Sequence, residues 1–137
     1  MKKWIWLLAV FALGLSGCTN LFALPPVSAS LGQPFTLGIG QSAKFDDGLV
    51  IAFENVPADE RCSSCTASFY AQVNLRFTAP GKSPVLISLT TPPNFKVTGD
   101  TASYTIQFIK LTPQPYYPHS PVLQQDYQLT LKVIPSY

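Results

Sequence analysis

The chain has 137 residues, a length that fits one domain, and its nine lysines and arginines against seven acidic side chains give a net charge of only +2. Lys2 and Lys3 account for the whole positive excess, so the rest of the chain is electrically balanced. Nucleic-acid binding requires clustered lysine and arginine that displace counterions, and the sequence contains no such cluster. The composition therefore excludes a nucleic-acid partner.

The N-terminal segment indicates an export signal. The two lysines are followed by an unbroken apolar run from Trp4 to Leu15, as in the charged and apolar regions of a secretory signal peptide. A helix of that length covers roughly 18 Å of an apolar layer about 30 Å thick, which is too short for a stable membrane span. We therefore expect residues 1–17 to be a cleaved signal peptide.

The apolar run ends in Leu15-Ser16-Gly17-Cys18, which resembles the lipobox of bacterial lipoproteins. The resemblance implies that a diacylglyceryl group is attached to the sulfur of Cys18 and that the signal peptide is cut just before this residue. The alternative is a secretory or uncleaved anchor segment in which Cys18 is incidental.

Lipid attachment at Cys18 implies a location in the cell. Several acyl chains, palmitate among them, hold a protein on a membrane where one chain holds it only marginally. Thr19 stands where an aspartate would resemble an inner-membrane retention signal. We therefore expect a membrane-anchored protein of the bacterial cell envelope that faces out of the cytoplasm, on the outer membrane if the host has one.

Residues 18–32 are predicted to form a lipid-anchored tether. Thr19–Ser30 contains many small polar residues, alanines and prolines, and Pro25-Pro26 disfavours a helix. A single folded domain is predicted over residues 33–137.

Apolar residues recur at every second position through this predicted domain, which indicates strands with one buried face. About seven short strands, with 13 prolines confined to turns and edges, favour an all-β fold, an antiparallel Ig-like β-sandwich, over a closed barrel. The alternating sets are Phe35–Ile39, Leu49–Phe53, Ala67–Phe77, Val85–Leu89, Tyr104–Phe108 and Tyr127–Val133.

Two acidic pairs, Asp46-Asp47 and Asp59-Glu60, fall in predicted turns, where solvated carboxylates cost little. Asp47-Gly48 predicts a tight hairpin turn that joins Phe45 to Leu49, because both residue types tolerate positive φ. Adjacent strand residues point to opposite faces, so neither pair is expected to act as a cooperating general acid and base. We interpret both pairs as turn and solubility residues.

Cys62-Ser63-Ser64-Cys65 is the motif with the strongest chemical implication. Such a pair can be a redox couple where a helix N-terminus lowers the pKa of the first thiol. Here the following residues alternate as a strand, so we expect a structural disulfide bond between Cys62 and Cys65 in an oxidising envelope. A redox pair and free or metal-bound thiols are the alternatives.

The sequence predicts no cofactor, metal or catalytic residue. His119 is the only histidine and Met1 the only methionine, which excludes a copper site of the methionine and histidine kind once the signal peptide is removed. A Ser-His-Asp triad would have to use His119, and nothing local supports one.

The segment Thr112–Gln125 breaks the strand rhythm. Four prolines lie among Tyr116, Tyr117 and His119, which predicts a long, stiff, partly polyproline loop. One interpretation is an interaction loop that presents these three residues to an envelope protein. The favoured alternative is a crossover of the sandwich whose tyrosines pack on their own domain.

Asp59-Glu60-Arg61-Cys62, followed by a second cysteine and a strand, resembles a group of uncharacterised bacterial envelope lipoproteins with an Asp-x-Arg-Cys motif. A proline-rich connection into a tyrosine-containing last strand extends the resemblance. Ala67-Ser68-Phe69 replaces the Trp-x-Gly of that group, so the resemblance is partial. It implies a fold and a location, and no activity.

Two functions remain. The sequence predicts a non-catalytic interaction or accessory module, anchored to the envelope through Cys18. The alternative is a thiol-dependent envelope redox protein that uses Cys62 and Cys65, and a thiol titration distinguishes the two.

Overall fold

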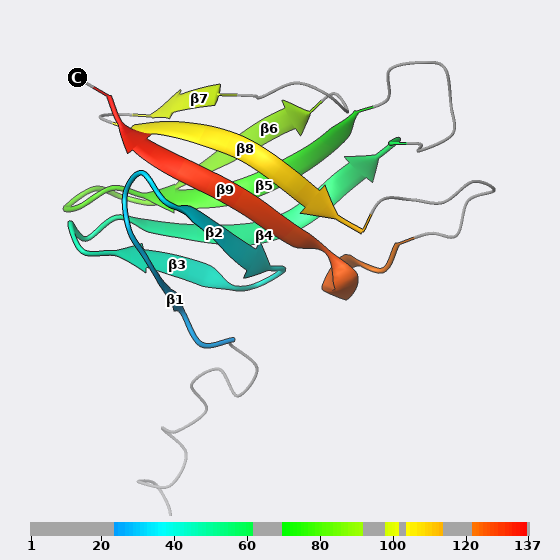
Figure 1. Ribbon diagram of the computed structural model, residues 1–137, viewed down its shortest axis with the longest axis horizontal. Coiled ribbons are helices and arrows are strands. Elements are labelled where there is room, and N and C mark those ends of the chain that lie inside the picture. The colour runs from blue at the N-terminus through cyan, green and yellow to red at the C-terminus, as the bar shows by residue number, and fades with distance from the viewer. Residues whose placement is uncertain (1–23, 62–69, 92–97, 102–103, 114–121, 137) are drawn as a thin grey trace, which may run out of the picture.

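The computed structural model describes residues 24–61, 70–91, 98–101, 104–113 and 122–136 (Figure 1). This part of the chain forms nine strands and one short 3-10 helix, η1. Their bounds are β1 Val27–Ala29, β2 Pro34–Gly38, β3 Ser42–Phe45, β4 Val50–Asp59, β5 Ala71–Thr78, β6 Val85–Thr91, β7 Thr98–Thr101, β8 Tyr104–Thr112, η1 Gln124–Asp126 and β9 Gln128–Pro135.

The strands form two sheets that pack face to face as a sandwich (Figure 1). One sheet has the order β1-β3-β4-β5-β6 and the other β2-β9-β8-β7. Neighbouring strands are antiparallel, except that β1 runs parallel to β3. The predicted all-β sandwich is confirmed. Strands β3 to β6 form one meander and strands β7 to β9 form another, while β1 and β2 from the N-terminal part of the chain join these meanders at β3 and β9.

The two strands beyond the expected seven are β1 and β7, which are the shortest, with three and four residues. β1 lies inside the segment expected to be a tether. Val27 pairs with Ala43 and Ala29 with Phe45, and the side chain of Ala29 joins the core. The expectation that residues 18–32 only link the lipid to the domain is therefore wrong for residues 27–29.

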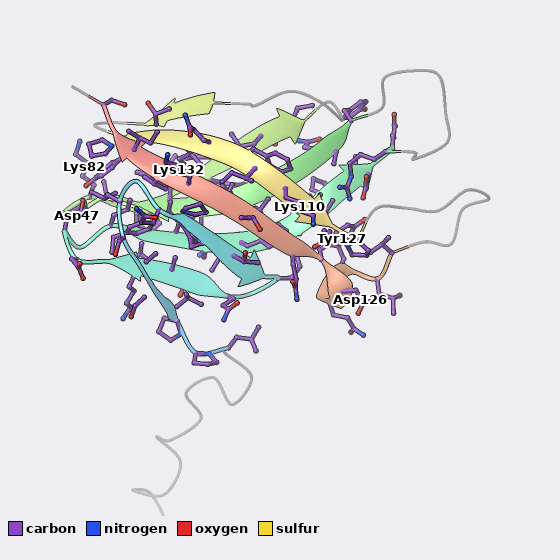
Figure 2. The ribbon with its side chains drawn as sticks, in the orientation of Figure 1. Asp47, Lys82, Lys110, Asp126, Tyr127 and Lys132 are labelled. Carbon is purple, nitrogen blue, oxygen red and sulfur yellow. The ribbon has the colours of Figure 1, made fainter. Side chains whose placement is uncertain are left out.

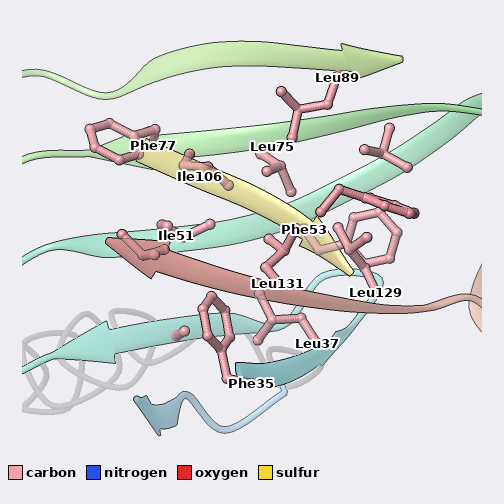
Figure 3. Packing of buried hydrophobic residues seen from close by; sticks show 14 of the residues in the cluster. Phe35, Leu37, Ile51, Phe53, Leu75, Phe77, Leu89, Ile106, Leu129 and Leu131 are labelled. Carbon is pink, nitrogen blue, oxygen red and sulfur yellow. The ribbon is translucent and has the colours of Figure 1, made fainter. Parts of the chain in front are cut away.

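The core lies between the sheets and follows from the alternating pattern of the sequence. In β5 every second residue is buried, from Ala71 to Phe77, because successive side chains of a strand point to opposite faces. Figure 3 shows these side chains meeting those of the other sheet. The largest fully buried side chains are Phe53, Leu37, Leu49, Ile51, Leu75, Ile106, Leu129, Leu131, Val73 and Val133.

The predicted hairpin between β3 and β4 is confirmed. The backbone N–H of Phe45 donates to the carbonyl of Leu49 over 2.9 Å, and that of Gly48 donates back to Phe45 over 3.0 Å. Gly48 has a φ of +89°, a conformation that glycine adopts without steric cost. The carboxylate of Asp47 accepts the N–H of Leu49 over 3.0 Å, which stabilises the turn.

Within the described ranges, none of the helices has the length and apolar character needed to cross a lipid bilayer.

Candidate functional site

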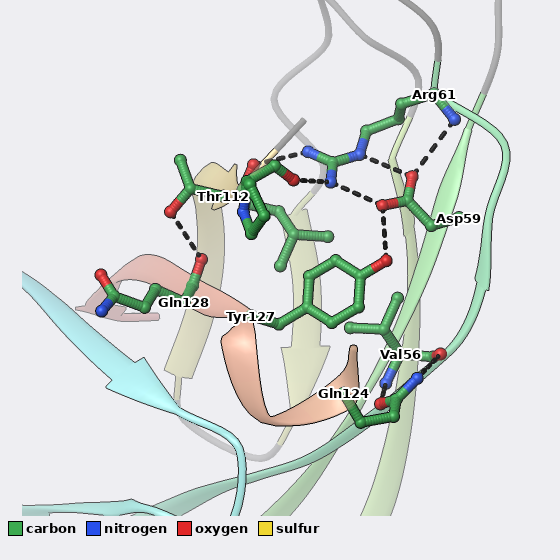
Figure 4. Close-up of polar contacts among 9 residues, drawn as sticks. Val56, Asp59, Arg61, Thr112, Gln124, Tyr127 and Gln128 are labelled. Atoms are coloured by element: carbon green, nitrogen blue, oxygen red, sulfur yellow. Dashed lines mark hydrogen bonds and ion pairs between the residues drawn. The ribbon is translucent and has the colours of Figure 1, made fainter. Parts of the chain in front are cut away.

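The two candidate segments identified in the sequence, the cysteine motif and the tyrosine segment, both begin at the same end of the sandwich. Arg61 directly precedes the cysteine motif, and Pro113 ends the described part of the chain before the tyrosine segment. Figure 4 shows the guanidinium of Arg61 beside the carboxylate of Asp59, with Tyr127 on the other side of that carboxylate. We call Asp59, Arg61 and Tyr127 the end cluster.

Among the described residues, Arg61 is the only charged one that is buried when its backbone and side chain are taken together. Its Nε donates to Asp59 Oδ1 over 2.8 Å and its Nη2 to Asp59 Oδ2 over 2.7 Å. The two side chains are only 7% and 6% exposed. This bidentate geometry is the strongest that an arginine and a carboxylate can form.

Arg61 also joins strands that are distant in sequence. Its Nη1 donates to the carbonyl of Leu111 over 2.5 Å, and its Nη2 donates to the carbonyl of Pro113 over 2.8 Å. Leu111 belongs to β8 of the four-stranded sheet, whereas Asp59 ends β4 of the five-stranded sheet. One guanidinium group therefore connects the two sheets at this end.

Tyr127 completes the end cluster. It follows η1 directly, and its hydroxyl donates to Asp59 Oδ2 over 2.9 Å. Burial raises the pKa of the Tyr127 phenol, and the hydrogen bond to Asp59 and the negative charge of that carboxylate raise it further, while the charge of Arg61 lowers it. The phenol is therefore protonated at neutral pH and acts as a donor.

A glutamine side chain supports the same end from η1. Gln124 Nε2 donates to the carbonyl of Val56 over 2.8 Å, while its Oε1 accepts the N–H of Val56 over 3.0 Å. The pairing of β4 with β5 shifts register between Asn55 and Ala58, around this residue. The side-chain amide of Gln124 therefore makes the two backbone hydrogen bonds that a neighbouring strand would make in a regular part of β4 (Figure 4).

The end cluster is suited to holding chain segments together and not to chemistry. The guanidinium donates from all three of its nitrogens, and the carboxylate of Asp59 accepts at both oxygens. General acid–base or nucleophilic catalysis requires a group that can face a substrate. Here the charged groups face one another, so the arrangement fixes geometry.

The structure corrects the interpretation of Asp59 as a solvated turn residue, whereas Glu60 is exposed as expected. Asp59 is the last residue of β4 and its carboxylate is buried against Arg61. The backbone N–H of Glu60 donates to the carbonyl of Tyr70 over 2.8 Å, which closes the base of the connection to β5. The spacing of Asp59 and Arg61 was an available signal, because residues two apart on an extended strand share a face.

The structure also corrects the interpretation of Thr112–Gln125 as a crossover between sheets. β8 and β9 are neighbours in the same sheet and pair antiparallel from Tyr104 and Pro135 to Thr112 and Gln128. The segment is therefore the connection of a long hairpin. It begins beside the end cluster, where the carbonyl of Pro113 accepts a hydrogen bond from Arg61.

The opposite end of the sandwich has its own tyrosine–carboxylate contact. The hydroxyl of Tyr104 donates to Asp47 Oδ2 over 2.6 Å, at the exposed hairpin turn. This hydrogen bond is the main cause of a raised pKa of Tyr104, with smaller contributions from burial and the charge of Asp47. Figure 2 shows Asp47 and Tyr127 at opposite ends of the molecule. Asp46 and Asp47 are exposed, as expected of turn residues.

The remaining predicted site residues, namely Cys18, Cys62, Cys65, Tyr116, Tyr117 and His119, lie outside the described residues. The lipid attachment, the disulfide bond and the interaction loop therefore stay predictions. No group of three metal-ligating side chains occurs within the described ranges.

Comparison of the chain with protein-family models, with curated proteins and with solved structures found no match.

Proposed function

We propose that this protein is a lipoprotein of the bacterial cell envelope, anchored through Cys18, and that its β-sandwich is a non-catalytic interaction or accessory module. The end cluster is the observation that supports this proposal. Arg61 joins the positions from which the Cys62–Cys65 segment and the Tyr116–His119 segment leave the sandwich, through its bonds to Asp59 and to the carbonyl of Pro113.

Binding residues are often carried on connecting segments that a rigid scaffold positions. In this protein a buried ion pair fixes the origins of two such segments, one of which carries two tyrosines. Tyrosine is enriched at protein interfaces because it combines a large apolar surface with a hydrogen-bonding hydroxyl. The partner that fits this segment is a protein of the envelope, bound through Tyr116 and Tyr117.

The anchoring is tested by metabolic labelling with palmitate in bacterial cells. The unsubstituted chain should incorporate label and fractionate with membranes, whereas Cys18→Ala should lose the label. Continued labelling of Cys18→Ala would contradict the proposed anchor.

The interaction is tested by crosslinking and co-purification from native membranes. The double variant Tyr116→Ala/Tyr117→Ala should lose co-purifying envelope proteins that the unsubstituted chain retains. Tyr70→Ala removes an exposed tyrosine of the described chain and is the matched control, which should retain them. An unchanged set of proteins in the double variant would contradict the proposal, and turnover of a disulfide substrate that requires Cys62 and Cys65 would favour the redox alternative.

A further inference from the structure

The N-terminal strands of the described chain lie together at one side of the sandwich. β1 is an edge strand of the five-stranded sheet and β2 an edge strand of the four-stranded sheet. Phe35 of β2 packs edge-to-face on Phe45 of β3, with ring centroids 5.3 Å apart, which holds these two edges against each other. Figure 1 shows β1, β2 and β3 at one side and β6 and β7 at the other. We call the side formed by β1 and β2 the entry side.

Only a short tether separates the entry side from Cys18. Gln41 Nε2 donates to the carbonyl of Pro25 over 3.3 Å, so the chain is bound to the sandwich from Pro25 onward. Leu24 is six residues from Cys18, and a chain of that length spans at most roughly 22 Å.

This tether is too short to bring the opposite side of the sandwich to a membrane. β1 and β6 are the outer strands of a five-stranded sheet, and strands spaced about 4.8 Å apart place them about 19 Å from each other. The tether would have to lie fully extended along the sheet to reach β6. No length would then remain to connect the domain with the lipid.

The tether also joins the sandwich midway along the strands. The backbone N–H of Gly40, next to Gln41, donates to the carbonyl of Phe53 over 2.8 Å. Phe53 lies near the middle of β4. The point of attachment is therefore closer to the middle of the sandwich than to the hairpin turn at one end or the end cluster at the other.

The residues nearest the anchor are compatible with a phospholipid surface. Leu24 is 49% exposed, and Leu21 and Phe22 add two large apolar side chains to the tether, a type that enters the lipid interface readily. From Thr19 to Phe45 the only charged residue is Lys44. A surface of anionic headgroups repels carboxylates and attracts lysine, and this stretch contains no carboxylate side chain.

We propose that the entry side faces the bilayer that holds the lipid on Cys18, and that β6 and β7 form the side farthest from it. This orientation rests on the proposed anchoring through Cys18. The strands then run along the membrane surface, and the hairpin turn and the end cluster lie at the two ends, clear of the lipid. A partner that binds at the end cluster therefore approaches from beside the domain.

The orientation is tested with single tryptophans, because both tryptophans of the chain, Trp4 and Trp6, lie in the predicted signal peptide. Ser28→Trp on β1 and Thr36→Trp on β2 mark the entry side, and Leu86→Trp on β6 marks the far side. All three positions are exposed. Each full-length variant is expressed in bacterial cells and reconstituted in vesicles whose phospholipids carry a nitroxide on the headgroup, which quenches tryptophan at short range. Quenching should be strong for both entry-side variants and weak for Leu86→Trp.

Mass spectrometry of the same proteins separates failure of the orientation from failure of the anchoring. It shows whether Cys18 carries lipid and whether residues 1–17 have been removed, and the proposed anchoring is wrong if either is not the case. If Cys18 carries lipid but Leu86→Trp is quenched as strongly as the entry-side variants, the anchoring stands and the orientation is wrong.

A longer tether tests whether the short chain causes the orientation. A flexible Gly-Ser segment of about 20 residues, inserted after Asn20, lets the domain move away from the bilayer and rotate. Quenching of Ser28→Trp should then fall toward the level of Leu86→Trp. Quenching of Ser28→Trp that stays unchanged would contradict the proposed role of the short tether.

Discussion

Two tyrosines donate to aspartates at opposite ends of this sandwich, and the shorter hydrogen bond is the more exposed one. Tyr104 reaches Asp47 over 2.6 Å at the hairpin turn, and Tyr127 reaches Asp59 over 2.9 Å in the end cluster. Water competes for the groups of the first pair, so their contact contributes little to stability. The second pair is buried beside Arg61, where any unpaired group would be costly. The contribution of each contact to stability therefore depends on its burial and its shared partners, and not on its distance.

The largest expected effect comes from Arg61→Ala. This variant leaves the carboxylate of Asp59 buried without its cation, and it leaves the carbonyls of Leu111 and Pro113 without their donor. Removing one partner of a buried ion pair costs about 3–5 kcal/mol. Chemical denaturation should show a free energy of unfolding lowered by this amount.

Arg76→Ala is the matched control for Arg61→Ala. Arg76 also pairs with a carboxylate, that of Glu54 over 2.8 Å, but its side chain is 57% exposed. We expect a loss below about 1 kcal/mol. Equal losses in the two variants would contradict the ranking by burial.

Tyr127→Phe and Tyr104→Phe compare the two hydroxyls directly. Tyr127→Phe removes a hydrogen bond to a buried charged group, while Arg61 still donates to the same oxygen, so we expect a loss of about 1.5 kcal/mol. Tyr104→Phe should change the free energy of unfolding by less than about 0.5 kcal/mol. Thermal or urea denaturation of both variants measures the difference, and a larger effect at Tyr104 would reverse the comparison.

At the hairpin end, the backbone should matter more than the tyrosine contact. Gly48→Ala forces an alanine into a φ of +89°, which costs about 1–2 kcal/mol. The added methyl group would meet only ordinary contacts with Pro80, at 3.6 Å. Gly38→Ala, at a glycine without positive φ, is the control and should change stability by less than about 0.5 kcal/mol. Equal losses of stability in the two variants would show that the positive φ of Gly48 is not the cause of the loss.

Tyr127 also makes the free energy of unfolding depend on pH. We rank this effect last because it is absent at neutral pH. Its pKa in the folded state is raised from the ordinary value of 10.0, so its contribution to stability is complete below pH 10 and is lost as pH rises toward the folded-state pKa. The free energy of unfolding should therefore fall more steeply above pH 10 in the unsubstituted protein than in Tyr127→Phe. Parallel slopes for the two proteins would contradict the raised pKa.

The sequence predicts the long strands well because burial repeats along them. Seven strands, those of the hairpin and the alternating sets, follow from this pattern. β1 has only three residues after two prolines, and β7 contains Gly99 and Asp100, so neither carries a detectable alternation. These strands form because a neighbouring strand offers hydrogen-bonding groups, which is information that lies elsewhere in the chain.

The end cluster is harder to predict for the same reason. Asp59 and Arg61 are only two residues apart, but the other partners of Arg61 come from 50 and 52 residues away, and Tyr127 lies 68 residues from Asp59. A carboxylate beside a predicted turn is ordinarily solvated. Only the packing of β8 and β9 over the end of β4 converts it into a buried ion pair.

The position of β2 in its sheet bears on when the protein can fold during its synthesis. β2 pairs only with β9 among the described strands, and Thr36 and Thr130, which face each other across that pair, are 94 residues apart. At a synthesis rate of 5–20 residues per second, β9 follows β2 by roughly 5 to 20 s. The four-stranded sheet therefore cannot close before β9 has been synthesised. A protein that we propose to be exported would gain from this delay, because a chain that has not completed its fold is easier to thread through a membrane channel.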